Sequence, residues 1–185
     1  MGKWLQTESF FQSRSGNGYN LKIHPRQHFG GKLSPPLAHY AVHRWFNFWS
    51  AQAIEMAFCA QPAVHAHPNA HNRLIDFYIH DIPFDHKTSV FPARYDRSLI
   101  QARRDTHRLI RWLYDNQSQY GRYHLGNRLF IILYAHHGAH WKLCAEVTAL
   151  ARVIEKYVAQ FNPDHLTKLS IADHKVWSDV LWYVK

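Results

Sequence analysis

Two aspartates and a lysine lie close together in the stretch from Arg73 to Pro92, which reads RLIDFYIHDIPFDHKTSVFP. Eight residues separate Asp76 from the triplet Asp85-His86-Lys87. Carboxylate oxygens are the ligands that hard divalent cations such as Mg²⁺ prefer, and a lysine beside them can offset charge on a phosphate. The three side chains therefore suit a metal site for phosphodiester cleavage.

Two strand-like segments would position these residues. Leu74 to Ile79 and Ile82 to Phe91 are rich in aromatic and β-branched residues, and His80-Asp81 interrupts them. If His80-Asp81 alone forms the loop, Asp76 faces Asp85 and the two carboxylates converge. Like charges that face each other cost a few tenths to about 1 kcal/mol, so a bridging cation would explain why a sheet keeps them.

A longer loop gives a more ordinary pair. His-Asp lacks the Asn-Gly or Asp-Gly that a type I′ hairpin turn favours. A four-residue loop from His80 to Pro83 sets Asp76 opposite Lys87, as a cross-strand ion pair. The residues alone leave both registers open.

The pattern Ile75-Asp76 followed by Asp85-His86-Lys87 resembles the PD-(D/E)XK nuclease signature, with isoleucine in place of the proline. The resemblance implies a restriction-endonuclease-like fold with elements in the order α-β-β-β-α-β. It also implies that Asp76, Asp85 and the backbone carbonyl of His86 bind Mg²⁺, or Mn²⁺, while Lys87 holds or helps deprotonate the attacking water. The implied activity is endonucleolytic hydrolysis of DNA.

Glu55 is the only carboxylate between Glu8 and Asp76, and it lies in the most apolar stretch of the chain. A lone carboxylate there is costly to bury unless it is paired, protonated or bound to a metal. By the same resemblance, a glutamate of the first helix contributes to the metal site or orients a water near it. Alternatively, Glu55 lies on a polar surface strip beside Gln52.

The remaining elements can be compared with the expected order. Leu37 to Gln61 lacks Gly and Pro, is largely apolar, and predicts a helix buried on more than one side. Further predicted elements are a short strand at Ala63–His67, an amphipathic helix at Ser98–Gln117, a strand buried on both faces at Arg128–Ala135, a helix at Trp141–Phe161, and a strand or amphipathic helix at Lys175–Tyr183. The sequence thus predicts an α/β fold, a central mixed β-sheet flanked by helices, with extra N- and C-terminal elements.

A length of 185 residues suits one domain with a sizeable core. We expect a basic, loop-rich arm at residues 1–36, a catalytic core at 37–135 and a C-terminal helical extension at 136–185. No apolar run reaches the roughly 18 residues that span a membrane, and we expect a cytoplasmic protein. Cys59 and Cys144 fall in apolar stretches and are expected to be buried thiols.

The net charge of +9 and the pI near 9.7 favour a polyanionic partner, because each cation near a phosphate releases a condensed counterion. We expect that partner to be DNA, most simply double-stranded, and a homodimer would supply two sites for cutting two strands. The candidate DNA-contact residues are Arg14, Lys22, Arg26, Lys32, Arg94, Arg103 and Arg104.

Histidines offer a different chemistry. His65, His67 and His71 form one cluster, and His136, His137 and His140 form another. Such spacings occur in zinc sites, although the chain has no His-Glu-x-x-His motif. A histidine-based metal hydrolase is therefore one alternative function, and a non-catalytic nucleic-acid-binding protein on the same fold is the other.

Overall fold

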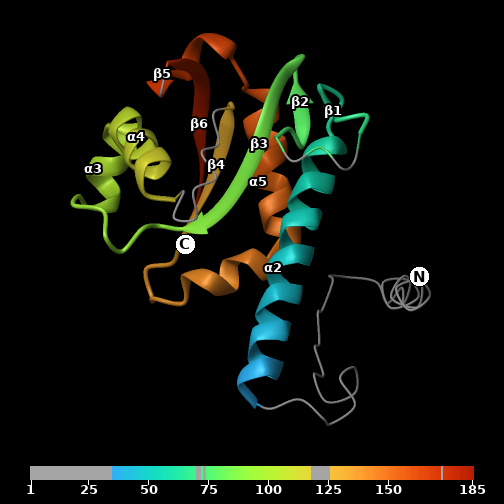
Figure 1. Ribbon diagram of the computed structural model, residues 1–185, viewed down its shortest axis with the longest axis vertical. Coiled ribbons are helices and arrows are strands. Elements are labelled where there is room, and N and C mark those ends of the chain that lie inside the picture. The colour runs from blue at the N-terminus through green and yellow to red at the C-terminus, as the bar shows by residue number, and fades with distance from the viewer. Residues whose placement is uncertain (1–34, 70–71, 73, 118–125, 172) are drawn as a thin grey trace.

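A computed structural model describes residues 35–69, 72, 74–117, 126–171 and 173–185, which form a six-stranded sheet with helices on both faces (Figure 1). The strands are β1 (Val64–Ala66), β2 (Phe77–Ile79), β3 (Ile82–Val90), β4 (Arg128–Tyr134), β5 (Thr167–Ile171) and β6 (His174–Val184), in the order β1-β2-β3-β4-β6-β5. The first three strands are antiparallel, β4 is parallel to β3 and β6, and β5 is antiparallel to β6. The predicted α/β class with a mixed sheet is confirmed.

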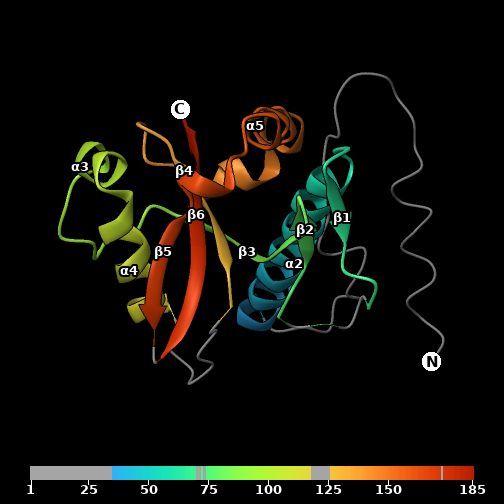
Figure 2. The same cartoon turned by 90° about the horizontal axis from the view of Figure 1, so that it is seen from above.

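The helices cover the sheet in two layers (Figure 2). They are α2 (Pro35–Cys59), α3 (Leu99–Arg104), α4 (Thr106–Gln117) and α5 (Val147–Ala159), with short 3-10 turns η2 (His140–Ala145) and η3 (Pro163–His165). Residues of α2 and α5 share one buried cluster, and residues of α3 and α4 share the other. We call the two faces of the sheet the α2 side and the α4 side.

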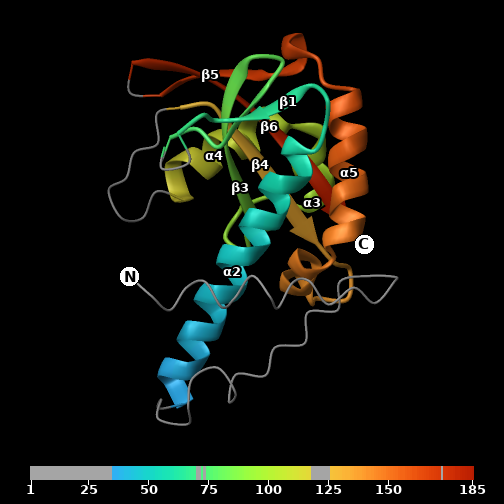
Figure 3. The same cartoon turned by 90° about the vertical axis from the view of Figure 1, so that its right-hand side faces the viewer.

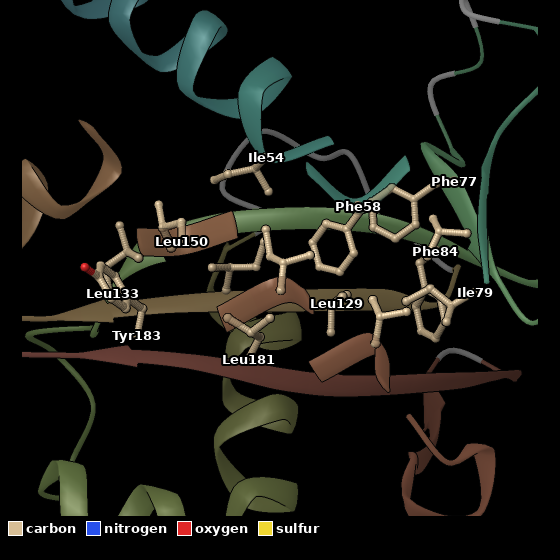
Figure 4. Close-up of a cluster of buried hydrophobic side chains, with 14 of the residues drawn as sticks. Ile54, Phe58, Phe77, Ile79, Phe84, Leu129, Leu133, Leu150, Leu181 and Tyr183 are labelled. Atoms are coloured by element: carbon tan, nitrogen blue, oxygen red, sulfur yellow. The ribbon is translucent and has the colours of Figure 1, made fainter. Parts of the chain in front are cut away.

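Strand β4 separates these two clusters. Leu129, Ile131 and Leu133 face the α2 side, whereas Phe130 and Ile132 face the α4 side. The apolar run predicted a strand buried on both faces, and β4 is that strand, because helices cover both faces of the sheet around it. Figure 4 shows the α2-side cluster, in which the Phe58 ring stacks on Phe77 with 4.6 Å between centroids.

The order helix, strand, strand, strand, helix, strand matches the prediction, but the predicted helix at Ser98–Gln117 is two helices. Asp105 breaks it, because its backbone leaves the helical region at φ −125° and ψ 69°. The Asp105 carboxylate then accepts a hydrogen bond from the Arg108 amide and begins α4. An aspartate side chain that bonds to the backbone can interrupt a helix in this way, so a segment without Gly or Pro can still be two helices.

The C-terminal segment differs most from expectation. The helix predicted at Trp141–Phe161 begins only at Val147, after the η2 turn. Residues 136–185 are not a helical extension, since β5 and β6 belong to the sheet and β6 pairs in parallel with β4. Val176 and Val180 pack on the α4 side, while Leu181 packs on the α2 side, so β6 carries the period-two pattern of a strand buried on both faces.

Helix α2 is longer than the sheet that it covers. Ile54 and Phe58 are buried, whereas Tyr40 and Phe48 are exposed on the N-terminal half, which extends away from the sheet (Figure 3). No helix in the described ranges has both the length and the apolar character needed to cross a membrane. The cysteines Cys59 and Cys144 are free thiols and half-buried.

Candidate active site

The β2–β3 hairpin has the shorter of the two predicted loops. Phe77 pairs with Phe84 and Ile79 pairs with Ile82, so only His80-Asp81 connects the strands. Both loop residues adopt positive φ, 45° at His80 and 65° at Asp81, as a type I′ turn requires. His and Asp tolerate this region better than most residues. The ladder ends at the Phe77–Phe84 pair, just before Asp76, so the four-residue loop that would set Asp76 opposite Lys87 does not form.

Asp76 lies where β2 begins. Its amide donates to the carbonyl of Phe84 at 2.9 Å, which extends the hairpin by one bond. Its carboxylate oxygen Oδ2 accepts from the His86 amide at 2.8 Å and from the His86 ring nitrogen Nδ1 at 2.6 Å. The Asp76 side chain is 24% exposed and that of His86 is 6% exposed. The carboxylate is thus held against the β3 backbone, just before the first residue of β2.

Glu55 approaches the same place from α2. Burial raises the pKa of Glu55, the negative charge of Asp76 raises it further, and His86 lowers it. The Gln52 amide donates to Glu55 Oε2 at 3.1 Å. Burial also raises the pKa of the Cys59 thiol, and the charges of Glu55 and Asp76 add to that effect. Glu55 is half-buried, bonded to Gln52, and close enough to Asp76 for the two charges to interact.

Asp85 has a different environment on the α4 side. Its Oδ2 accepts from Arg128 Nε at 2.7 Å, and the two residues pair directly between β3 and β4. The side chains are 18% exposed for Asp85 and 8% for Arg128. The Arg128 guanidinium also lies 5.9 Å from the ring centroids of Tyr114 and Phe130. Asp85 therefore belongs to a largely buried ion pair.

A hydroxyl network completes this side. Tyr114 donates to the Gly126 carbonyl at 2.9 Å, and its oxygen lies 2.8 Å from Oγ of the buried Ser178. Since Tyr114 has one proton, the Ser178 hydroxyl donates to Tyr114. Burial raises the pKa of Tyr114 to about 12. The network holds α4 against β6 beside the ion pair.

Lys87 lies on the same side as Asp85, two residues further along β3. The side chain is half-buried. Burial lowers the pKa of Lys87, the charge of Arg128 lowers it further, and Asp85 partly offsets both effects. His86 faces the other way, which agrees with the predicted parity of the triplet.

The predicted residues thus lie on β3 or next to it, but their side chains point to opposite faces of the sheet. Asp76, His86 and Glu55 gather on the α2 side of β3, and Asp85 and Lys87 lie on the α4 side with Arg128. The predicted convergence of the Asp76 and Asp85 carboxylates differs from this arrangement for two reasons. Asp76 precedes the first residue of β2, and its carboxylate accepts a hydrogen bond from the His86 amide. Strand β4 supplies Arg128 opposite Asp85. Arg128 was not predicted, and its only sequence signal is a charge at the start of an apolar strand.

No three His, Cys, Asp or Glu side chains within the described ranges form a group that could hold a metal ion. His65 and His67 instead stack on Tyr78, at 4.8 and 5.9 Å between ring centroids. His140 Nδ1 accepts from the Ala135 amide at 2.8 Å. These histidines serve packing and hydrogen bonding, and His71 lies outside the described residues.

The candidate DNA-contact residues fall into two groups. Arg94, Arg103 and Arg104 are exposed, on the loop before α3 and at the end of α3. Arg14, Lys22, Arg26 and Lys32 lie outside the described residues.

Comparison with known proteins adds no relative, since no family model, no curated protein and no solved structure matches this chain. The chain's own sequence and geometry therefore carry its functional interpretation.

Proposed function

We propose that the protein is a Mg²⁺-dependent DNA endonuclease with a restriction-endonuclease-like core. The observation that carries the proposal is the pair of hydrogen bonds from His86 to the Asp76 carboxylate, which joins Asp76 to the triplet Asp85-His86-Lys87. The element order gives further support, because three antiparallel strands follow α2 and β4 then pairs in parallel with β3. This is the order that the resemblance to PD-(D/E)XK nucleases implied.

The donor set suits Mg²⁺ in kind. Mg²⁺ usually takes one or two carboxylates and completes its shell with water and substrate phosphate, so it does not need a cage of three side chains. Asp76 would hold it from the α2 side, with Glu55 nearby, and Mn²⁺ suits the same oxygens. The resemblance also assigns the His86 carbonyl and Asp85 to this ion, and Asp85 would have to leave Arg128 and reach the other side of β3 to bind it. When bound, the ion supplies charge stabilisation on the phosphoryl oxygens and lowers the pKa of a bound water.

The chain's own groups have separate roles in this proposal. The resemblance assigns the attacking water and the offset of phosphate charge to Lys87, whose side chain lies on the α4 side beside the Asp85–Arg128 pair. Glu55, whose pKa burial and Asp76 raise, orients a water on the α2 side. Arg94, Arg103 and Arg104 contact the backbone of double-stranded DNA, and a homodimer would cut both strands.

Plasmid cleavage with and without Mg²⁺ tests the proposal. We expect Asp76→Asn and Lys87→Ala each to reduce the rate by about 100-fold or more, the usual scale for a group that transfers or positions a proton. Lys156→Ala, at an exposed position on α5, is the matched control and should cleave like the wild type. Wild-type rates in Lys87→Ala, or cleavage that does not depend on a metal, would contradict the assignment.

The Asp85–Arg128 ion pair favours a second candidate, a non-catalytic nucleic-acid-binding protein on the same fold. A carboxylate whose charge is already matched by a guanidinium has less attraction for a metal ion. This candidate predicts DNA binding that weakens steeply with salt and no cleavage at any Mg²⁺ concentration. The same plasmid experiment, with a binding measurement beside it, separates the two functions.

A further inference from the structure

We propose that the imidazole of His86 is a positioning residue that fixes the orientation of the Asp76 carboxylate for the reaction. The resemblance gave His86 a role only through its backbone carbonyl, so a role for the ring is additional. This inference rests on the proposed nuclease function.

Both hydrogen-bond donors of His86 meet the same oxygen. The amide and the ring nitrogen Nδ1 lie 2.8 and 2.6 Å from Asp76 Oδ2. A carboxylate oxygen at such a distance accepts, so Nδ1 carries the proton and the ring tautomer is set. Two donors from one rigid residue fix the plane of the carboxylate as well as its position.

The ring itself is held in place. The His86 side chain is 6% exposed, and its ring stacks against Phe77 with 5.9 Å between centroids and 27° between planes. Phe77 is in turn stacked on Phe58 of α2. The α2-side core therefore determines where the imidazole points, and through it where the Asp76 carboxylate lies.

His86 is the member of the triplet suited to this task. Asp85 and Lys87 project to the α4 side, where they interact with Arg128. His86 projects to the α2 side, where His86 lowers the pKa of Glu55 and Asp76 raises it. The alternation of side chains along β3 thus assigns the ring to Asp76 and the two charged residues to the other side.

The experiment compares three full-length variants by plasmid cleavage over a range of Mg²⁺ concentrations. His86→Leu keeps an apolar side chain of similar size but removes the ring donor, and His86→Asn keeps an N–H donor near the position of Nδ1. We expect His86→Leu to raise the half-maximal Mg²⁺ concentration or lower the saturated rate by about 10- to 100-fold, the usual cost of losing a residue that orients a metal ligand. His86→Asn should recover most of that loss.

His65→Leu, on the edge strand β1, is the control and should have the wild-type Mg²⁺ dependence. A purely structural role would lower stability in His86→Leu without changing its Mg²⁺ dependence, and that result would overturn the inference. Equal losses in the leucine and asparagine variants would also overturn it. Wild-type protein that fails to cleave with Mg²⁺ would instead overturn the proposed function.

A second measurement covers a leucine variant that does not fold. Long-range ¹H–¹⁵N NMR of the wild type reports which ring nitrogen of His86 carries the proton. We expect protonated Nδ1 in the wild type and a changed ring signal in Asp76→Asn. A neutral ring protonated at Nε2 in the wild type would overturn the inference.

Discussion

The two sides of β3 carry opposite balances of charge. On the α2 side, the His86 imidazole is hydrogen-bonded to Asp76 and lowers the pKa of Glu55. On the α4 side, Asp85 shares its surroundings with Arg128 and Lys87. Among the described residues named here, the first side has more acids than bases, which favours a cation, and the second has more bases than acids, which favours an anion such as phosphate.

The two sides also differ in what their charged residues do for the fold. The Asp85–Arg128 pair is largely buried and continues into the Tyr114–Ser178 hydroxyl pair. Removing one partner of such a pair leaves an uncompensated buried charge. The Asp76 carboxylate is more exposed and is held by hydrogen bonds from the amide and ring of His86. We therefore expect substitutions in the Asp85–Arg128 pair and its hydroxyl network to act mainly on stability, and those on the α2 side mainly on activity.

Arg128→Met should have the largest effect. It leaves the Asp85 carboxylate buried without its cation, and we expect the free energy of unfolding to fall by about 3–5 kcal/mol. Urea denaturation measures it. Adding Asp85→Asn to Arg128→Met should recover part of the loss, because the uncompensated charge is then gone.

The exposed Arg108–Asp96 pair supplies the control for this comparison. Its hydrogen bond, from Arg108 Nη2 to Asp96 Oδ2, is 2.8 Å long, but both side chains are well exposed. Such surface pairs contribute at most about 1 kcal/mol. Arg108→Met should therefore change stability little, and an Arg128→Met variant that loses no more than Arg108→Met would contradict the division of roles between the two sides.

Tyr114→Phe should have the next largest effect. The substitution keeps the ring beside Arg128 and removes the hydroxyl, which leaves the buried Ser178 hydroxyl and the Gly126 carbonyl without that partner. We expect a loss of about 1–3 kcal/mol in thermal or urea unfolding. Tyr40→Phe, at an exposed ring on α2, should be neutral. A neutral Tyr114→Phe would show that the hydroxyl network contributes little to stability.

The order of elements was predictable because several segments carry strong patterns. The apolar run at 128–135 and the long segment without Gly or Pro at 37–61 were long enough to identify a strand and a helix, and the structure has both. The hairpin register was not predictable, since His80-Asp81 adopts a type I′ conformation without the usual Asn-Gly or Asp-Gly. A slip of two residues would have set Asp76 opposite Lys87.

The division of the site was also beyond sequence reasoning. Arg128 is 43 residues from Asp85, and their contact depends on how the parallel strands β3 and β4 align. The connection between these parallel strands is long and contains α3 and α4, so no local turn motif reports how they align. The partial burial of Glu55 was easier to anticipate, because a single acid in an apolar helix is costly to bury unless it is paired, protonated or bound to a metal.

Lys87→Met should have a smaller effect, and its sign depends on pH. Folding lowers the pKa of Lys87 below the ordinary 10.5, so the unfolded chain holds this proton more tightly. The charged form therefore destabilises the fold at neutral pH, and this penalty is relieved as pH rises towards 10.5. Lys87→Met should be slightly more stable than the wild type at pH 7 and no more stable near pH 10.5, while cleavage is lost. Loss of stability at pH 7 would indicate that Lys87 belongs to the structural pair.

Glu55→Gln should have the smallest effect on stability, and it tests the acid excess of the α2 side directly. Burial and Asp76 raise the pKa of Glu55 above 4.5, so folding disfavours its charged form, and stability is lost as pH rises from about 4.5 through the folded pKa. Glutamine has no charge to lose, so the variant should gain on the wild type above that range and match it at pH 4. Asp76→Asn should behave differently, because the His86 amide and ring both lose a charged acceptor. Urea denaturation at pH 4 and pH 7.5, with plasmid cleavage on the same samples, separates the cases. Glu55→Gln without a gain at pH 7.5 would mean that the α2 side already balances its acids, and the case for a cation on that side would fail with it.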